Sequence, residues 1–143
     1  MYKSMKKALF SFLFLAIALT ISAQETPFKC HLYNDTYQVY MELDLYGSLM
    51  VPNQDIFGEL PGYFGAKRDT RLWLVTDAEI LSSNKARLSV VNDFGSEDFV
   101  GDLIYNGEGK YTFKHKEGSV WKIVVNGKYV KIPKEIQLVA EDK

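Results

Sequence analysis

The chain holds few of the side chains that most often perform acid–base or nucleophilic chemistry. It has two histidines, His31 and His115, and one cysteine, Cys30. His115 alternates with Tyr111 and Phe113, which is typical of a histidine at the edge of a core. No serine stands in the Gly-x-Ser-x-Gly pattern of a nucleophile elbow. We therefore predict a protein that is not an enzyme and binds no cofactor.

Acidic residues offer candidates for metal or glycosidase chemistry. Asp93, Glu97 and Asp98 share one predicted loop and could supply oxygens to calcium, but their spacing does not follow the EF-hand pattern. The two histidines and the cysteine make a poor zinc ligand set. Glu42 and Asp44 project from the same face of a predicted strand, but two acidic residues are common on any polar strand face and do not by themselves indicate a glycosidase. We predict no metal site and no hydrolase.

The segment 57–68 has the most unusual composition in the chain. It combines aromatic residues with glycines, a proline and a basic end, within a stretch, 47–70, that is dense in helix and strand breakers. Glycines permit close approach, and aromatic side chains supply rigid contact area for a protein or a sugar ring. The segment predicts a binding loop, or alternatively a plug whose aromatics fold into a barrel end. The candidate binding residues are Phe57, Tyr63, Phe64, Lys67 and Arg68.

A second candidate surface is basic. Lys110, Lys114 and Lys116 project from one face of a predicted strand, in a region, 110–134, that holds seven lysines and a single acid, Glu117. Such a face suits an acidic partner or an anionic glycan. The alternative is that these lysines protect an exposed strand edge from aggregation.

The elements that must position these residues are strands. Apolar and polar residues alternate through most of the chain after residue 27, and no long helical periodicity occurs. Asn106-Gly107 and Asn126-Gly127 are strong hairpin signals. In the predicted first strand Phe28, Cys30 and Leu32 share one face, so Cys30 is expected to be buried. The predicted strands are 28–33, 37–46, 71–81, 86–91, 99–105, 110–116, 120–125, 128–132 and 136–140.

This pattern predicts an all-β fold, an antiparallel meander closing into a small calycin-like barrel, with a β-sandwich as the alternative. The two Asn-Gly turns imply neighbouring antiparallel pairing from 99 to 132, which favours the barrel.

The N-terminal residues 1–23 have the pattern of a signal peptide. Lys3, Lys6 and Lys7 precede an apolar run of about a dozen residues, shorter than the roughly 20 that span a bilayer, and Ala23 ends a small-residue exit. Cys30 lies too far downstream to carry a lipid. We expect one exported β domain, 24–143, that is periplasmic or extracellular, not lipidated and not stably inserted in the membrane.

Removal of this segment changes the charge of the chain. Three lysines and no acid are lost, which leaves 14 basic residues against 18 acidic ones and a net charge of about −4. An acidic protein is a poor nucleic-acid binder. A single cysteine also excludes an internal disulfide, so the core and the sheet must stabilise the fold.

Phe28-Lys29-Cys30 and Gly65-Ala66-Lys67 resemble features of the small periplasmic barrels that inhibit C-type lysozyme. The chain lacks the second cysteine of that family and the serine and tyrosine of its inhibitory loop. It also lacks the early Gly-x-Trp of lipocalins, because Trp73 and Trp121 lie mid-chain. No family is assigned on these residues.

These observations predict an exported, non-enzymatic binding module for an envelope or extracellular protein or glycan. One alternative is a barrel that carries a small apolar ligand in its interior. Another is an inhibitor of a host or competitor enzyme.

Overall fold

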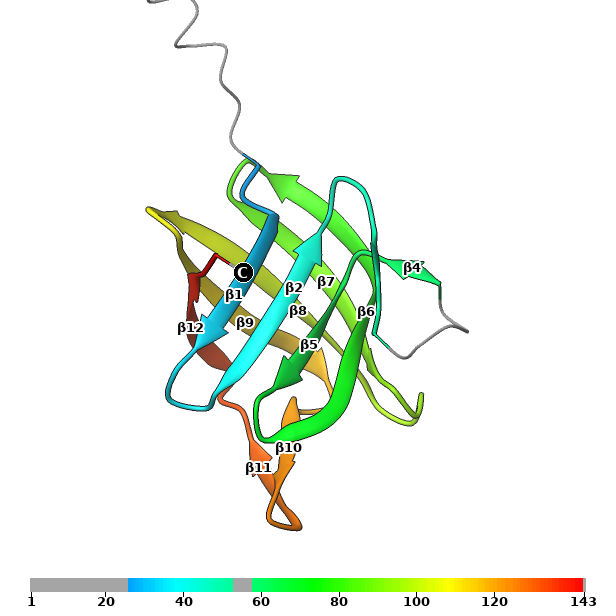
Figure 1. Cartoon of the computed structure of the whole chain (residues 1–143). Coiled ribbons are helices and arrows are strands. Elements are labelled where there is room, and N and C mark those ends of the chain that lie inside the picture. Colours follow the sequence, from blue (N-terminus) through cyan, green and yellow to red (C-terminus); the bar gives the residue numbers. More distant parts are fainter. Residues whose placement is uncertain (1–25, 53–57, 143) are drawn as a thin grey trace, which may run out of the picture.

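The computed structural model describes residues 26–52 and 58–142, and its main body is a closed, eight-stranded antiparallel β-barrel (Figure 1). Each barrel strand pairs with the next barrel strand along the chain, and the last pairs with the first. The strands are β1 (Lys29–Asn34), β2 (Val39–Asp44), β5 (Gly62–Ala66), β6 (Asp69–Ser82), β7 (Lys85–Asn92), β8 (Asp98–Gly107), β9 (Lys110–Gly118) and β12 (Glu135–Ala140).

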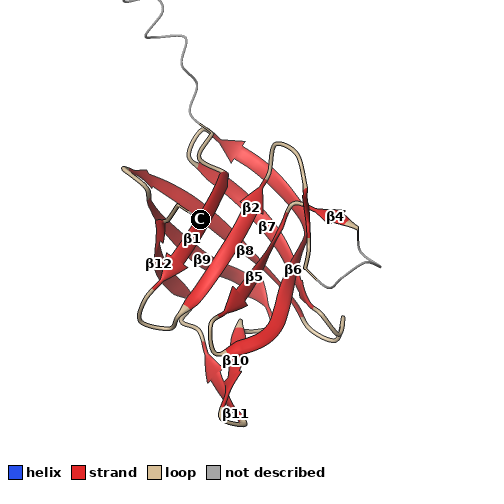
Figure 2. Ribbon diagram, viewed as in Figure 1, coloured by secondary structure: helices blue, strands red, loops and turns tan. Residues whose placement is uncertain are grey.

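Two short hairpin ribbons interrupt this order. β3 (Leu49–Met50) pairs with β4 (Glu59–Leu60), and β10 (Lys122–Val125) pairs with β11 (Lys128–Lys131). The described residues otherwise form turns and loops (Figure 2). The predicted all-β, up-and-down barrel is therefore confirmed, and the sandwich is wrong. The predicted signal peptide and Phe57 lie outside the described residues.

Side chains fill the barrel interior. Alternate residues of each strand point inward, as the period of two requires, and they bring aromatic rings together at the centre. The ring centroid of Phe64 lies 4.9 Å from that of Trp121 and 5.5 Å from that of Phe113. Cys30, predicted to be buried, is partly buried and packs against this core. His115 lies at the edge of the core, where Nε2 is 2.8 Å from the carbonyl oxygen of Ser119.

The ends of the barrel are closed by residues outside its strands. Ile123 of β10 is buried in the core together with Trp121 and Ile132, which flank the β10–β11 ribbon, and the ribbon lies below one end of the barrel (Figure 1). Phe28 precedes β1 and is buried in the same core. Residues 121–132 thus help to close this end, and among the described residues of 57–68 Phe64 packs in the interior as part of the barrel wall. A filled interior does not favour the small-ligand alternative.

The predicted loop 57–68 is wrong for residues 62–66, which form the barrel strand β5 between β2 and β6. Its glycines indicate turns by composition, but in the structure they make room for the neighbouring strand β2. A Cβ at Gly62 would overlap the carbonyl oxygen of Glu42, and one at Gly65 would overlap the ring of Tyr40. A strand with two glycines has a weak alternation pattern, so its place is visible only from its neighbours.

The predicted continuous pairing from 99 to 132 is confirmed within the hairpins β8–β9 and β10–β11 and is wrong between β9 and β10. β10 pairs with β11 alone, and β12 takes the place beside β9, with Ile136 opposite Phe113. The first hairpin turn lies two residues later than predicted. Its central residues are Glu108 and Gly109, whose φ angles are 53° and 73°, a pattern that suits a tight two-residue turn.

Candidate functional site

Of the predicted binding residues that the structure describes, Tyr63 and Lys67 line one open hollow of about 370 Å³, whereas Phe64 lies apart from them. Phe64 is 0 % exposed and faces the barrel interior. Tyr63 is 9 % exposed, faces outward and is covered by a small cluster that includes Val51 and Leu74. Only Lys67 and Arg68, in the turn after β5, are exposed, and both contact the barrel wall.

Those contacts are local. The Lys67 Nζ lies 4.2 Å from the centroid of the Tyr33 ring, and Arg68 donates a hydrogen bond of 3.4 Å to the carbonyl oxygen of Tyr37. Among its described residues the segment thus mainly serves the packing of the barrel, because Phe64 is enclosed and Tyr63, which lines the hollow beside Lys67, is only 9 % exposed.

The predicted basic face is a charge-balanced row. Five oppositely charged residues alternate across five neighbouring strands, each opposite the next in register. In order from β6 to β12 they are Glu79, Arg87, Asp102, Lys114 and Glu135. The face is therefore not a uniform cationic surface. It is not a strand edge either, because β9 lies between β8 and β12.

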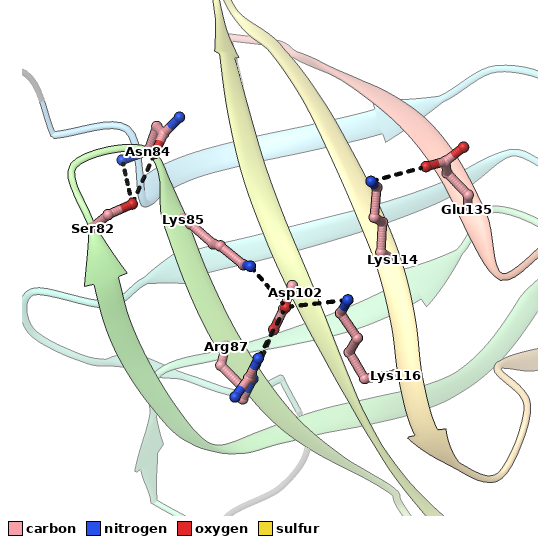
Figure 3. Close-up of polar contacts among 8 residues, drawn as sticks. All are labelled: Ser82, Asn84, Lys85, Arg87, Asp102, Lys114, Lys116 and Glu135. Atoms are coloured by element: carbon pink, nitrogen blue, oxygen red, sulfur yellow. Dashed lines mark hydrogen bonds and ion pairs between the residues drawn. The ribbon is translucent and has the colours of Figure 1, made fainter.

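The centre of this row is Asp102, whose carboxylate is 0 % exposed although it faces outward. Figure 3 shows Lys85, Arg87 and Lys116 directed toward it, with nitrogen–oxygen distances of 3.5, 2.9 and 3.8 Å. The hydrogen bond from Arg87 holds the pKa of Asp102 below its usual range. Lys114 instead pairs with Glu135 at 3.5 Å, and Lys110 lies at the end of β9 beside Gly107. The ion pairs of Asp102 with Lys85, Arg87 and Lys116 connect neighbouring strands and stabilise the sheet.

A histidine and a carboxylate meet on the opposite side of the barrel. His31 Nδ1 and Glu42 Oε1 form a hydrogen bond, and the ring of Tyr40 stacks on His31 at 5.8 Å. Burial, together with the charge of Glu42, raises the pKa of both Tyr40 and Tyr63. Acid–base catalysis would also need a nucleophile or a positioned acceptor. Cys30 points into the barrel, where burial raises its pKa to about 12.

A cleft at the end of the barrel carries the most accessible aromatic side chains. Phe94 is 75 % exposed and Tyr129 is 68 % exposed, which makes them the two most exposed large hydrophobic residues in the described part of the chain. Both line one cleft of about 160 Å³. Its walls are the start of β6, the β7–β8 loop and the β10–β11 ribbon.

Carboxylates tie these walls together. Asp69 accepts a hydrogen bond of 2.8 Å from the backbone nitrogen of Val124, which fixes β10 against β6. Asp93 accepts one of 3.2 Å from the backbone nitrogen of Leu72, which fixes the β7–β8 loop against β6. Such contacts hold the cleft in one shape without a bound ligand, which reduces the entropy lost on binding.

The cleft is charged but nearly balanced. Asp69, Asp93 and Glu97 supply three carboxylates, and Arg71 and Lys122 supply two cations. Lys122 pairs with Glu97 at 2.7 Å, whereas the guanidinium of Arg71 has no ion pair with any described residue. The cleft therefore combines apolar rings with donors and acceptors, as small-molecule sites do.

A larger, open groove of about 560 Å³ lies along the outer face of β6 to β9. Its lining includes Val91, Val100, Asp98 and Glu117, and it presents no exposed aromatic ring and no cation. Volume alone therefore does not make it the better candidate. The β7–β8 loop borders both hollows, because residues 91 and 98 line the groove and residues 92–94, 96 and 97 line the cleft.

The sequence interpretation missed this cleft. In the sequence, the loop 92–98 stands out by its acidic residues. The signal for the site is an aromatic residue, Phe94, among the loop formers Asn92, Asp93 and Gly95. Tyr129 carries no such signal, because it alternates like any strand residue. The rings of Phe94 and Tyr129 line one cleft only because the β10–β11 ribbon packs at the end of the barrel that carries the β7–β8 loop.

Within residues 26–52 and 58–142, no group of three or more histidines, cysteines or acids is placed to hold a metal ion. The same residues form no helix with the length and apolar character needed to cross a membrane. Comparisons of the chain with protein-family models, with curated proteins and with solved structures found no match. The candidate site consequently stands on its own geometry.

Proposed function

We propose that this chain is an exported, non-enzymatic binding module that recognises its partner through the cleft between Phe94 and Tyr129. The observation that carries this proposal is that Phe94 and Tyr129 are both highly exposed and lie at the same site. The two most exposed large hydrophobic side chains of the described residues line the same hollow.

Exposed aromatic rings support binding because they bring a large contact area at a low cost in side-chain entropy. Tyrosine and arginine are also enriched among residues that dominate binding energy. In this cleft a phenylalanine, a tyrosine and an unpaired Arg71 lie together. The filled barrel interior supports a surface site over an internal ligand.

The absence of catalysis is supported by the orientation of reactive groups. The side chains of His31 and Glu42 pair on the outer face of the barrel, whereas the side chain of Cys30 packs on the inner face of the strand that also carries His31. Export is supported by the signal-like residues 1–23. The mass of the protein recovered from the envelope or the culture medium tests cleavage after Ala23. A mass that includes residues 1–23 would contradict it.

The binding function is tested by affinity capture with protein produced from the full chain. Immobilised wild type is compared with the double variant Phe94→Ala/Tyr129→Ala and with the control Ile80→Ala/Val139→Ala, which removes two exposed apolar side chains outside the cleft. A component of the envelope or medium that binds wild type and control, but not the cleft variant, supports the proposal. Equal capture by all three proteins would overturn it.

A further inference from the structure

The two exposed rings of the cleft each have a cation against one face. The guanidinium carbon of Arg71 lies 5.9 Å from the centroid of Phe94, and Lys122 Nζ lies 5.0 Å from that of Tyr129. Cation–π contacts of this kind orient a ring and leave its opposite face for another partner. The cleft thus offers two exposed, flat apolar platforms, each with a cation near its ring.

Between the platforms lie hydrogen-bonding groups with spare capacity. Asp93 uses Oδ2 for the Leu72 nitrogen, and Glu97 uses Oε1 for Lys122, so Oδ1 and Oε2 of these residues make no hydrogen bond within the described chain. Carboxylate oxygens are strong acceptors for hydroxyl groups. Arg71 adds unused donors beside them. A ligand that carries several hydroxyls would satisfy both kinds of group.

The charge of the cleft disfavours an anionic ligand. Three carboxylates outnumber two cations, and one of those cations, Lys122, is already paired with Glu97. A phosphate, sulfate or uronate would meet net negative charge at short range. An extended apolar ligand would leave the carboxylates of Asp93 and Glu97 desolvated without partners.

We infer that the ligand of this cleft is an uncharged carbohydrate, an inference that rests on the proposed binding function. A pyranose ring has one face of C–H groups, which stacks on an aromatic ring, and an edge of hydroxyls, which bonds to carboxylates and guanidinium groups. Phe94 or Tyr129 holds the face of the sugar, and Asp93, Glu97 and Arg71 bond its hydroxyls. The cleft takes one ring, and the groove beyond the β7–β8 loop leaves room for further units of the chain.

The inference is tested with immobilised oligosaccharides, an uncharged set built from glucose, galactose, mannose or N-acetylglucosamine and an anionic set that carries uronate, sulfate or phosphate. Binding of protein from the full chain to the strongest probe is then measured in solution by titration calorimetry. The fluorescence of Trp73, which lines the cleft, gives a second readout. We expect an uncharged probe to bind, and the double variant Phe94→Ala/Tyr129→Ala to weaken its binding at least about tenfold.

The control Ile80→Ala/Val139→Ala should bind the sugar as wild type does, and the Arg71→Ala variant should bind it more weakly while the protein keeps its melting temperature. Binding of anionic probes alone, binding that survives the Phe94 and Tyr129 substitutions, or binding of no sugar would each overturn the inference. If no sugar binds but capture of a protein still depends on Phe94 and Tyr129, the binding function stands and its partner is a protein. Loss of both results overturns the two together.

Discussion

Arg87 holds the carboxylate of Asp102 at two points, with Nε 2.9 Å from Oδ1 and a terminal guanidinium nitrogen 3.2 Å from Oδ2. The two residues lie opposite each other on neighbouring strands, so the sheet register itself sets this geometry. A two-point pair is more specific than a single ion pair, because the planar guanidinium matches the planar carboxylate. The pair fixes β7 against β8 on the outer face of the barrel.

The Arg87–Asp102 pair predicts how stability depends on pH. The folded pKa of Asp102 lies below its unfolded value, so the ionised carboxylate stabilises the fold above about pH 4 and this contribution is lost as pH falls through the folded pKa. Arg87→Ala removes the main cause of the shift. We expect the variant to unfold at a higher pH than wild type in an acid titration followed by circular dichroism.

The control for this prediction is Lys114→Ala, which breaks the exposed pair with Glu135 and should change the free energy of unfolding by less than about 1 kcal/mol. The difference in stability between Arg87→Ala and wild type should shrink as the pH falls through the lowered folded pKa of Asp102, because the carboxyl group is then protonated in both proteins. A difference that stays constant from neutral to acid pH would contradict the role of Asp102.

Trp121 is expected to stabilise the barrel by closing one end. Trp121→Ala removes a buried ring that contacts Phe64 and Phe113 and should lower the free energy of unfolding by about 3–5 kcal/mol. Its Nε1 has no hydrogen-bond partner among the described residues, so Trp121→Phe sacrifices no hydrogen bond and should cost much less. Urea denaturation measures both. Equal losses for the two variants would show that filling the barrel end is not the role of this ring.

Substitution by alanine should change the free energy of unfolding by very different amounts at two phenylalanines. Phe64→Ala creates a cavity at the centre of the barrel and should lower the free energy of unfolding by about 3–5 kcal/mol. Phe94→Ala removes a ring that is 75 % exposed and should cost less than about 1 kcal/mol. Thermal unfolding of the two variants compares them directly. A large loss at Phe94 would assign its ring to the core and not to a partner.

Cys30 should react slowly in the folded protein. Burial, with a smaller contribution from the charge of Glu42 and against the lowering effect of a hydrogen bond with Tyr111, raises the pKa of its thiol to about 12, so almost no thiolate forms near neutral pH. Iodoacetamide should label the native protein at least about tenfold more slowly than the protein unfolded in urea. Because the folded pKa exceeds the unfolded value, ionisation of Cys30 should destabilise the fold as pH rises above about 8.5. Equal labelling of both states would contradict burial of the thiol.

Several elements follow from local pattern alone. The alternation in residues 37–46 and 110–116 places Met41, Leu43 and Phe113 on inward faces, because the side chains of any strand alternate with a period of two. The same rule places Cys30 and His115 correctly. These features need no knowledge of the partner strand, and they were enough to predict an all-β barrel.

Other elements depend on what lies across the sheet. Gly62 and Gly65 have the composition of a turn, yet they belong to a strand because Glu42 and Tyr40 of β2 occupy the space of their missing side chains. The tight turn at Asn126-Gly127 forms as expected. No local sequence pattern shows, however, that the β10–β11 ribbon lies outside the barrel sheet while Trp121 packs in the barrel core. Glycine has two uses, and only the neighbouring strand distinguishes them.

The sequence by itself determined most of the barrel strands, the class of fold and the scarcity of catalytic groups, because these are properties of composition and of neighbouring residues. Tertiary structure alone decided which aromatic residues a partner can reach. Phe64 and Phe94 have the same side chain, and the first is enclosed by the barrel while the second lies on its rim beside Tyr129. Exposure depends on what packs against a residue from distant parts of the chain, and no local pattern records it.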